Sequence, residues 1–416
     1  MDSSRRAFIK AGTVLGPLGA LAARTAPPQA RDLALGQWIL AAATAPVLRR
    51  ELFPDPVTIE TIEVIENRGE EMVRVRSKDG ATGLSVGRLL GTTWPILLDR
   101  IAPFFTGRDA RDLDDIIDGV YRDKSNYKWQ GLPYWVAHAA LEMAMLDLLG
   151  RVVGQPLGAL VGEIRNREIP VYRASGQRGN SPEEEIEYLQ KLVAETGAKA
   201  IKFRLGAMMR MDDASTRRDL ALIPLTRKVF GDDMTIYADA NGSYDVPTSL
   251  RIGRLMQDHG LAFFEEPVPF DYYDETKAVA DALEIPIAGG EQESSLRRFR
   301  WMIEHRCVDL VQPDLFYFGG FVRSIRVARM AAAAGMKCTP HMSGGGLGYL
   351  YAAHFMSCIP NAGAFVEYKG HPEDLPVSSP SSPLRSVRGR LRVPSGPGVG
   401  VTIDPAFVRG ATAMTS

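Results

Sequence analysis

Between residues 57 and 88 the chain alternates apolar and polar residues, as in VTIETIEVIENRG and EEMVRVRSKDG. This alternation predicts β-strands, because successive side chains of a strand point to opposite faces of a sheet. Turn sequences at Asn67–Gly69 and Asp79–Gly80 divide the segment, and both contain the glycine that tight hairpin turns favour. We therefore expect strands that are joined by hairpin turns.

The following segment, residues 89–162, has a helical pattern. In residues 137–154 the apolar residues recur three or four positions apart, and the run ends at Gly154, which is a typical helix stop signal. Strands followed by helices predict a separate α+β module. We assign this module to residues 31–165.

Beyond residue 168 the pattern of apolar and polar residues changes, and short β-rich runs alternate with segments of helical pattern. The runs are IPVYRAS, KAIKFRL, MTIYADA, AFFEE, IPIAGGE, VDLVQPD, MKCTPH and AFVEY. Helical patterns between them include residues 182–196, 216–229, 247–259, 294–305 and 321–334. Alternation of this kind predicts βαβ units, and eight strands favour an α/β fold with a (β/α)8-type, TIM-like barrel over residues 166–370. An open doubly wound sheet is the alternative, but no GxGxxG motif follows the first strand.

The composition is that of a globular protein with a large core. The 416 residues are 45% hydrophobic and 24% charged, and the formal net charge is −1. Near neutrality and the lack of a basic stripe give no reason to expect nucleic acid as a partner. The three cysteines lie in apolar contexts, which predicts small buried side chains and no disulfide framework. The tail, residues 371–416, is rich in Pro, Gly and Ser, and we expect it to pack back over the first module.

The first thirty residues resemble an export signal. The sequence SSRRAFIKAGTVLGPLGALAAR pairs Arg5 with Arg6 and continues into a weakly apolar run with small residues near Ala20–Ala26. This pattern predicts a twin-arginine signal peptide over residues 1–30 and a periplasmic location. The apolar run is too short and glycine-rich for a stable membrane span. A chance pair of arginines is the alternative.

The last polar residues of the barrel runs form a regular series. They are Lys202 with Arg204, then Asp239, Glu265, Glu291, Asp314, His341 and Glu367. From Asp239 onward the intervals are 26, 26, 23, 27 and 26 residues. Each residue therefore falls at the end of the strand in one of the successive βα units. The C-terminal rim of such a barrel is where the active site lies, and we expect these side chains to converge there.

Three consecutive strands end in an acid, at Asp239, Glu265 and Glu291. Three converging carboxylates repel one another unless a cation lies between them, and oxygen ligands favour a hard ion, Mg²⁺ first. Glu266 and Glu293 are competing neighbours. Strand alternation predicts that either Glu265 or Glu266 points inward, but not both.

These motifs together resemble the enolase superfamily, and specifically its mandelate racemase subgroup. The resemblance covers nearly the whole chain after the signal, through AIKFRLG, YADANG, FFEEP, GGE and the closing PSGPGVGV. It implies that the first module is an N-terminal capping domain. It also implies proton abstraction next to a carboxylate, with Mg²⁺ stabilising the enediolate. The roles it implies are metal ligation by Asp239, Glu265 and Glu291, a pocket position for Asn241, and a hydrogen bond to the substrate from Glu367.

The resemblance pairs His341 with Asp314. A single histidine at a strand end is more often a packing residue, but Asp314 ends the adjacent strand and could hold one ring nitrogen, which raises the basicity of the other. Other subgroups, such as muconate lactonising enzymes and dipeptide epimerases, carry a lysine on the sixth strand. Here that position is Asp314, which argues against them.

The second strand departs from the racemase pattern. Racemases carry Lys-x-Lys, whereas this chain has Lys202-Phe203-Arg204, and arginine does not give up its proton in proteins. Arg204 therefore suits a fixed cation, and Lys202 a contact to the substrate carboxylate. A single base, His341, favours dehydration of a sugar acid to a 2-keto-3-deoxy acid.

The substrate is thus expected to be a small carboxylate, and the enzyme a hydro-lyase. A racemase or epimerase that uses Lys202 is the alternative within the family, and a non-catalytic sugar-acid binding protein is the alternative outside it. Tyr172 and Trp129 are further candidates for substrate contact. The family sets specificity with capping loops near Asn67–Glu70 and 124–131, and a homo-oligomer is typical of it.

Overall fold

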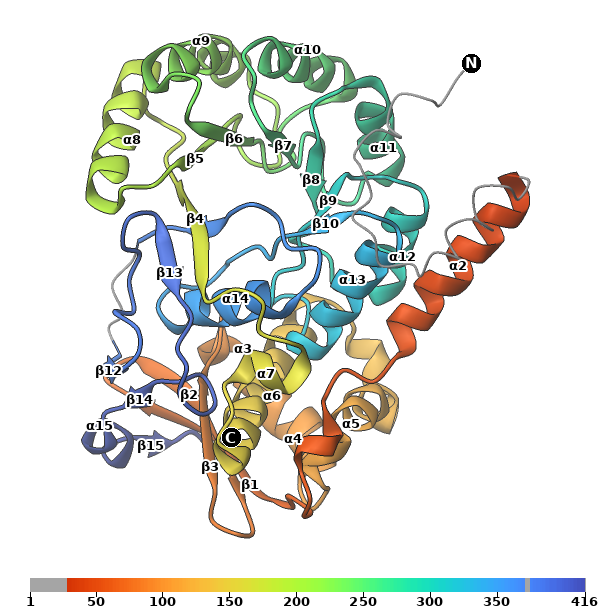
Figure 1. Cartoon of the computed structure of the whole chain (residues 1–416), viewed down its shortest axis with the longest axis vertical. Coiled ribbons are helices and arrows are strands. Elements are labelled where there is room, and N and C mark those ends of the chain that lie inside the picture. The colour runs from red at the N-terminus through yellow and green to blue at the C-terminus, as the bar shows by residue number, and fades with distance from the viewer. Residues whose placement is uncertain (1–27, 371–374, 416) are drawn as a thin grey trace.

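The computed structural model describes residues 28–370 and 375–415, and Figure 1 shows its two parts, a barrel and a capping domain. The predicted twin-arginine segment falls almost wholly outside the described residues. In the capping domain, β1 (Ile59–Asn67), β2 (Glu70–Ser77) and β3 (Thr82–Val86) form an antiparallel sheet. Their turns lie where the sequence predicts them, and Gly69 and Gly80 adopt φ of 85° and 84°.

Six helices belong to this part of the described chain, and of these α6 and α3 pack on the sheet. The six are α2 (Pro28–Thr44), α3 (Leu90–Ile96), α4 (Ala102–Phe105), α5 (Leu113–Val120), α6 (Leu132–Val153) and α7 (Leu157–Val161). Short 3₁₀ helices lie between them at Arg50–Leu52, Ala110–Asp112 and Asp123–Trp129, and a π-helical turn at Leu97–Ile101. The central helix, α6, ends at Gly154, which caps it with φ of 68°. Because α6 lies between the sheet and the barrel, it is buried on nearly all sides.

Eight parallel strands form the barrel, which confirms the predicted fold class. They are β4 (Glu168–Ala174), β5 (Ala200–Arg204), β6 (Thr235–Asp239), β7 (Phe263–Glu265), β8 (Ile287–Gly289), β9 (Leu310–Val311), β10 (Lys337–Cys338) and β11 (Val366–Tyr368). Neighbours in the chain pair in order from β4 to β10, and β11 pairs with β4. A parallel bridge between Cys338 and Ala362 joins the remaining two edges. The strand ends therefore face one opening.

Seven helices surround the strands. They are α8 (Pro182–Thr196), α9 (Asp213–Phe230), α10 (Val246–Asp258), α11 (Tyr273–Ala282), α12 (Leu296–Glu304), α13 (Phe321–Ala333) and α14 (Leu347–Cys358). The pattern did not single out α11 or α14. Every residue of α14 is buried, so its sequence lacks the polar face that makes a surface helix recognisable.

The C-terminal tail contacts both parts of the fold. Strand β13 (Arg390–Arg392) pairs with β4 of the barrel, whereas β15 (Thr412–Ala413) pairs with β1 of the capping sheet. Between them, β14 (Thr402–Ile403) pairs with β12 (Val377–Ser378), and α15 (Pro405–Arg409) follows. None of the helices within residues 28–370 and 375–415 combines the length and apolar character that crossing a bilayer requires.

Candidate active site

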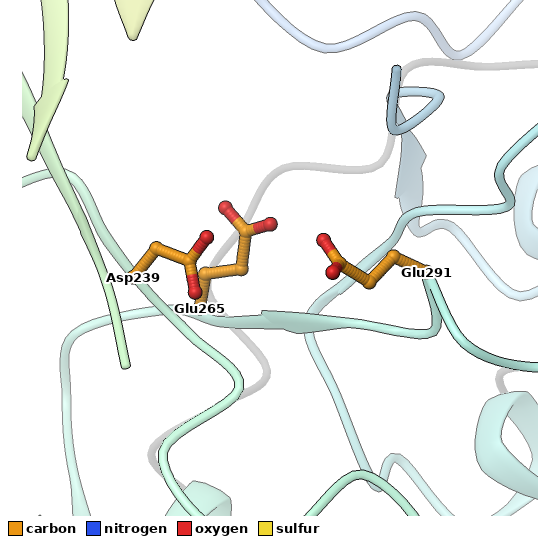
Figure 2. A group of neighbouring side chains, drawn as sticks. All are labelled: Asp239, Glu265 and Glu291. Atoms are coloured by element: carbon orange, nitrogen blue, oxygen red, sulfur yellow. The ribbon is translucent and has the colours of Figure 1, made fainter. Parts of the chain in front are cut away.

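Three carboxylates meet at the C-terminal end of the barrel strands. Asp239 and Glu265 are the last residues of β6 and β7, and Glu291 lies two residues beyond β8. One oxygen atom from each lies within 4.8 Å of the others, and all three residues are buried. Figure 2 shows the three side chains turned toward one another. The predicted convergence of these acids is therefore present in the structure.

The two neighbouring glutamates lie in different environments. Glu293 Oε1 accepts hydrogen bonds from the backbone N–H groups of Ser294 and Ser295, both at 2.7 Å, close to the start of α12. Both glutamates are buried, but only Glu266 lines the cavity above the barrel. The expectation that only one of Glu265 and Glu266 points inward was wrong. Strand β7 ends at Glu265, and Glu266 adopts φ of 42°, so strict alternation no longer applies.

Lys202, on β5, partly balances the acidic charge. It is fully buried, and its Nζ lies 2.7 Å from Glu265 Oε2. The same atom is 3.3 Å from Asp239 Oδ2 and 3.3 Å from Glu367 Oε1. Burial alone lowers the pKa of Lys202, but Glu265 and Glu367 outweigh it and hold this pKa above its usual value. The lysine is therefore a fixed cation among the carboxylates.

Asn241 connects the second cation of β5 to the acids. Arg204 Nη1 donates to Asp239 Oδ2 and, at 2.9 Å, to Asn241 Oδ1. The Nδ2 group of Asn241 lies 3.3 Å from Glu291 Oε1. Arg178, from the loop after β4, also donates to Asn241 Oδ1. The predicted place of Asn241 beside the acids is thus present, and Arg178 is an additional cation there.

The acidic cluster has the properties of a site for a hard divalent cation. Glu265 Oε1 is buried without a hydrogen-bond partner. Burial raises the pKa of Glu291 to about 8, and the nearby carboxylates Glu266 and Glu265 add to this effect. Three close carboxylates of this kind are the oxygen donors that Mg²⁺ prefers. Asp239, Glu265 and Glu291 therefore fit the metal that the sequence predicts.

His341 faces the same cluster. Its Nδ1 lies 2.7 Å from Asp314 Oδ2. Its Nε2 lies 3.1 Å from Glu291 Oε2 and 3.5 Å from Glu367 Oε2. Burial lowers the pKa of His341, but Glu291 and the hydrogen bond to Asp314 outweigh it, so the pKa is raised. One ring nitrogen is thus held by Asp314 and the other is directed at the acids, which is the geometry of a general base.

Backbone amides hold Asp314 in place. Its Oδ1 accepts hydrogen bonds from Phe316 N and Tyr317 N, both at 2.8 Å, and its Oδ2 accepts one from Ser343 N at 2.9 Å. The carboxylate is fully buried. Four groups, with His341 as the fourth, therefore fix the position of this carboxylate beside the imidazole ring. Asp314 can therefore stabilise a protonated His341.

A cavity of about 500 Å³ opens above the cluster, and Arg204, Asn241, Glu291 and His341 are among its lining residues. Six other polar lining residues were not predicted from the sequence, and they are Arg88, Arg178, Gln292, Tyr317, Ser343 and Lys369. All six lie in loops or just beyond a strand end, where a single sequence gives no periodic signal.

The two aromatic candidates lie away from the lining residues of this cavity. Tyr172 is fully buried inside the barrel, 5.3 Å beneath the ammonium group of Lys202 and packed edge-to-face on Tyr237. Trp129 is 48% exposed, and the guanidinium of Arg100 lies over its ring. In this structure both side chains make packing contacts.

Family models cover most of the chain. The Mandelate racemase / muconate lactonizing enzyme, N-terminal domain model matches residues 48–162, and the Enolase C-terminal domain-like model matches residues 184–407. The second match alone covers more than half of the sequence. The two matches correspond to the capping domain and to the barrel with its tail.

Individual proteins agree with these matches. The chain is 26% identical to arabinonate dehydratase of Saccharolobus solfataricus over 79% of this chain and 87% of that protein. A crystal structure from Roseobacter denitrificans, described as a candidate racemase, shares 34% identity and a TM-score of 0.80, covering 86% of this chain and 99% of that one. A mandelate racemase/muconate lactonizing protein from Paracoccus denitrificans PD1222, complexed with magnesium, shares 26% identity and a TM-score of 0.77 over the same shares. The chain therefore belongs to the enolase superfamily, and within it to the mandelate racemase subgroup.

Proposed function

We propose that this protein is a Mg²⁺-dependent hydro-lyase that dehydrates a sugar acid to a 2-keto-3-deoxy acid. The observation that carries the proposal is that the site holds one histidine base, His341, together with Arg204. Arg204 is permanently charged and occupies the position where a racemase has its second base. Similarity to a dehydratase of a sugar acid supports the same reaction.

The metal ligands and the two cations have separate roles in the proposed reaction. Mg²⁺ bound by Asp239, Glu265 and Glu291 would supply Lewis-acid stabilisation of negative charge on the substrate. Lys202 and Arg204 are cations beside that position, suited to orienting the substrate carboxylate and stabilising the charge that develops when the C2 proton leaves.

His341 carries the proton transfers. Its Nε2 takes the proton from C2, while Asp314 stabilises the imidazolium that results. The C2 electron pair forms the C2–C3 double bond as the C3–O bond breaks, and the imidazolium returns its proton to the departing hydroxyl, which leaves as water. The enol that remains becomes the 2-keto-3-deoxy acid. One histidine can thus serve first as base and then as acid.

The alternative within the family is a racemase or epimerase that uses Lys202 as the second base. The position of Lys202 weighs against it, because its ammonium group contacts Asp239, Glu265 and Glu367. This placement among the carboxylates suits a fixed cation better than a base that would face His341 across the substrate. A non-catalytic binding protein is the alternative outside the family, and it would have no need of the His341–Asp314 pair.

A single experiment separates these functions. The protein is incubated with Mg²⁺ and a panel of sugar acids in D₂O, and 2-keto acid release and deuterium incorporation at C2 of the recovered substrate are measured together. A dehydratase releases keto acid, whereas a racemase incorporates deuterium with inversion and releases none. A binding protein does neither. In the dehydratase, His341→Asn abolishes turnover, and activity that survives this substitution would refute the assignment of the base.

We also propose that the protein is exported through the twin-arginine pathway to the periplasm. The support is the sequence around Arg5 and Arg6 and the small residues that follow. The test is cell fractionation of the full chain and of the Arg5→Lys, Arg6→Lys double variant. Export predicts periplasmic wild type and cytosolic variant, and identical distributions would refute it.

A further inference from the structure

The polar side chains along one edge of the cavity are two cations and two hydroxyl groups, all of which can donate hydrogen bonds. It is formed by Arg88, Tyr317, Ser343 and Lys369, which come from the capping domain and from the loops after β9, β10 and β11. None of the four serves in the proposed proton transfers. A group of donors that faces a cavity and includes two cations is suited to bind an anion.

Lys369 is the part of this edge nearest the reaction centre. Its Nζ donates to Met342 O at 2.9 Å and lies 3.6 Å from Glu367 Oε2. Glu367 is already shared, since its Oε1 is 3.3 Å from Lys202 and 3.7 Å from Arg204. Lys369 therefore shares this carboxylate with two other cations. Lys369 is the first residue after β11, and it lines the cavity.

Arg88 and the two hydroxyl groups continue the edge outward. The loops that carry Tyr317 and Ser343 are adjacent, because the backbone N–H groups of both residues donate to Asp314. Arg88 lines the same cavity. Ser343 Oγ is buried without a hydrogen-bond partner. Arg88 is exposed and forms no ion pair with a residue of the described chain. The backbone of Ser343 is fixed, because its N–H donates to Asp314.

We propose that Arg88, Tyr317, Ser343 and Lys369 form a second anion subsite, and that the substrate is a diacid with a carboxylate at each end of its carbon chain. The inference rests on the proposed function, which places the first carboxylate beside Lys202 and Arg204. His341 is connected to both groups of donors. Asp314 contacts His341 and Ser343, and Glu367, which contacts Lys202 and Arg204, lies 3.5 Å from His341 Nε2. The apolar side chains of Met208 and Phe270, which line the same cavity, suit the C–H face of the chain between the two charges.

The first test compares substrates that differ in one terminus. Aldaric and aldonic acids of the same length and configuration are assayed for 2-keto acid release, and kcat/KM is expected to be larger for the diacid by about tenfold or more. In Arg88→Gln the ratio of the two kcat/KM values falls toward one. Arg76→Gln is the matched control, because Arg76 is an exposed arginine of the same domain that does not line the cavity, and it retains the wild-type ratio.

The second test measures binding without turnover. 2-Hydroxyadipate and 2-hydroxyhexanoate have equal chain lengths and no C3 hydroxyl to lose, and their affinities in the presence of Mg²⁺ are compared by calorimetry. The subsite predicts tighter binding of the diacid in the wild type and in Arg76→Gln, and loss of this preference in Arg88→Gln.

The outcomes distinguish the subsite from the proposed function. Dehydration of aldonic acids without any preference for diacids overturns the subsite and leaves the proposed function standing. Tighter, Arg88-dependent binding of the diacid without dehydration of any sugar acid supports the subsite and overturns the proposed function. Equal binding of the two probes overturns the subsite whatever the activity.

Discussion

Two buried histidines outside the active site should make the folded protein sensitive to acid. His138 Nδ1 lies 2.9 Å from Gly319 O, and His354 Nε2 lies 3.1 Å from Val399 O. Both imidazoles are fully buried. Burial lowers the pKa of each to about 4, and the hydrogen bond to the carbonyl only partly opposes this shift. The perturbation that tests this is replacement by leucine, in His138→Leu, His354→Leu and the double variant.

The direction in which stability changes with pH depends on how many protons the folded and unfolded states bind. An unfolded histidine binds a proton near pH 6.5, whereas these two bind one only near pH 4 when folded. Unfolding between those values takes up protons, so stability is fully present above pH 6.5 and falls as the pH is lowered. The full difference is about 3 kcal/mol for each histidine, of which about 2 kcal/mol is lost by pH 5.

The assay is urea unfolding at pH 8 and at pH 5, with the free energy of unfolding compared between the two. We expect the loss between these values to be about 2 kcal/mol smaller in each single variant and about 4 kcal/mol smaller in the double variant. Other groups also titrate between these pH values, including Glu142, whose pKa burial raises to about 8. They contribute equally in the wild type and in the variants, so their effect cancels when the losses are compared. A wild-type loss that persists unchanged in His138→Leu and His354→Leu would refute the reasoning.

Three other substitutions or treatments test the remaining structural arguments. Gly320→Ala should lower the free energy of unfolding by about 1–3 kcal/mol or more in urea titrations, because Gly320 has φ of 108° and an added Cβ would lie 2.5 Å from the Glu142 carboxyl; an unchanged value contradicts this. Removal of Mg²⁺ with a chelator should lower Tm, since saturation at 100 times Kd contributes about 2.7 kcal/mol; a Tm insensitive to Mg²⁺ contradicts the metal assignment. Asp314→Asn should lower kcat by about 10²–10⁴-fold. It should also move the acidic limb of the pH profile of kcat/KM to lower pH, because Asp314 raises the pKa of His341. An acidic limb that does not move would show that Asp314 does not control the pKa of His341.

The sequence predicts the parts of this site that depend on strand periodicity. Asp239 and Glu265 end their strands, and the barrel brings them together without any special local geometry. Glu266 was misjudged because its conformation is left-handed, and a period of two residues does not extend past the end of a strand. Arg88 could not be predicted, because it reaches the cavity only through the docking of the capping domain, which no local pattern encodes. Helix α14 escaped notice because burial on all sides removes the amphipathic signal.

The two attachments of the tail constrain how this protein can be re-engineered. Strand β13 pairs with β4, while β15 pairs with β1, so residues 375–415 complete two sheets at once. A chimera that exchanges only the capping domain for that of a relative would leave β15 beside a foreign edge strand. Transplanting substrate preference therefore requires moving two separate pieces of chain, the N-terminal module and the last strand.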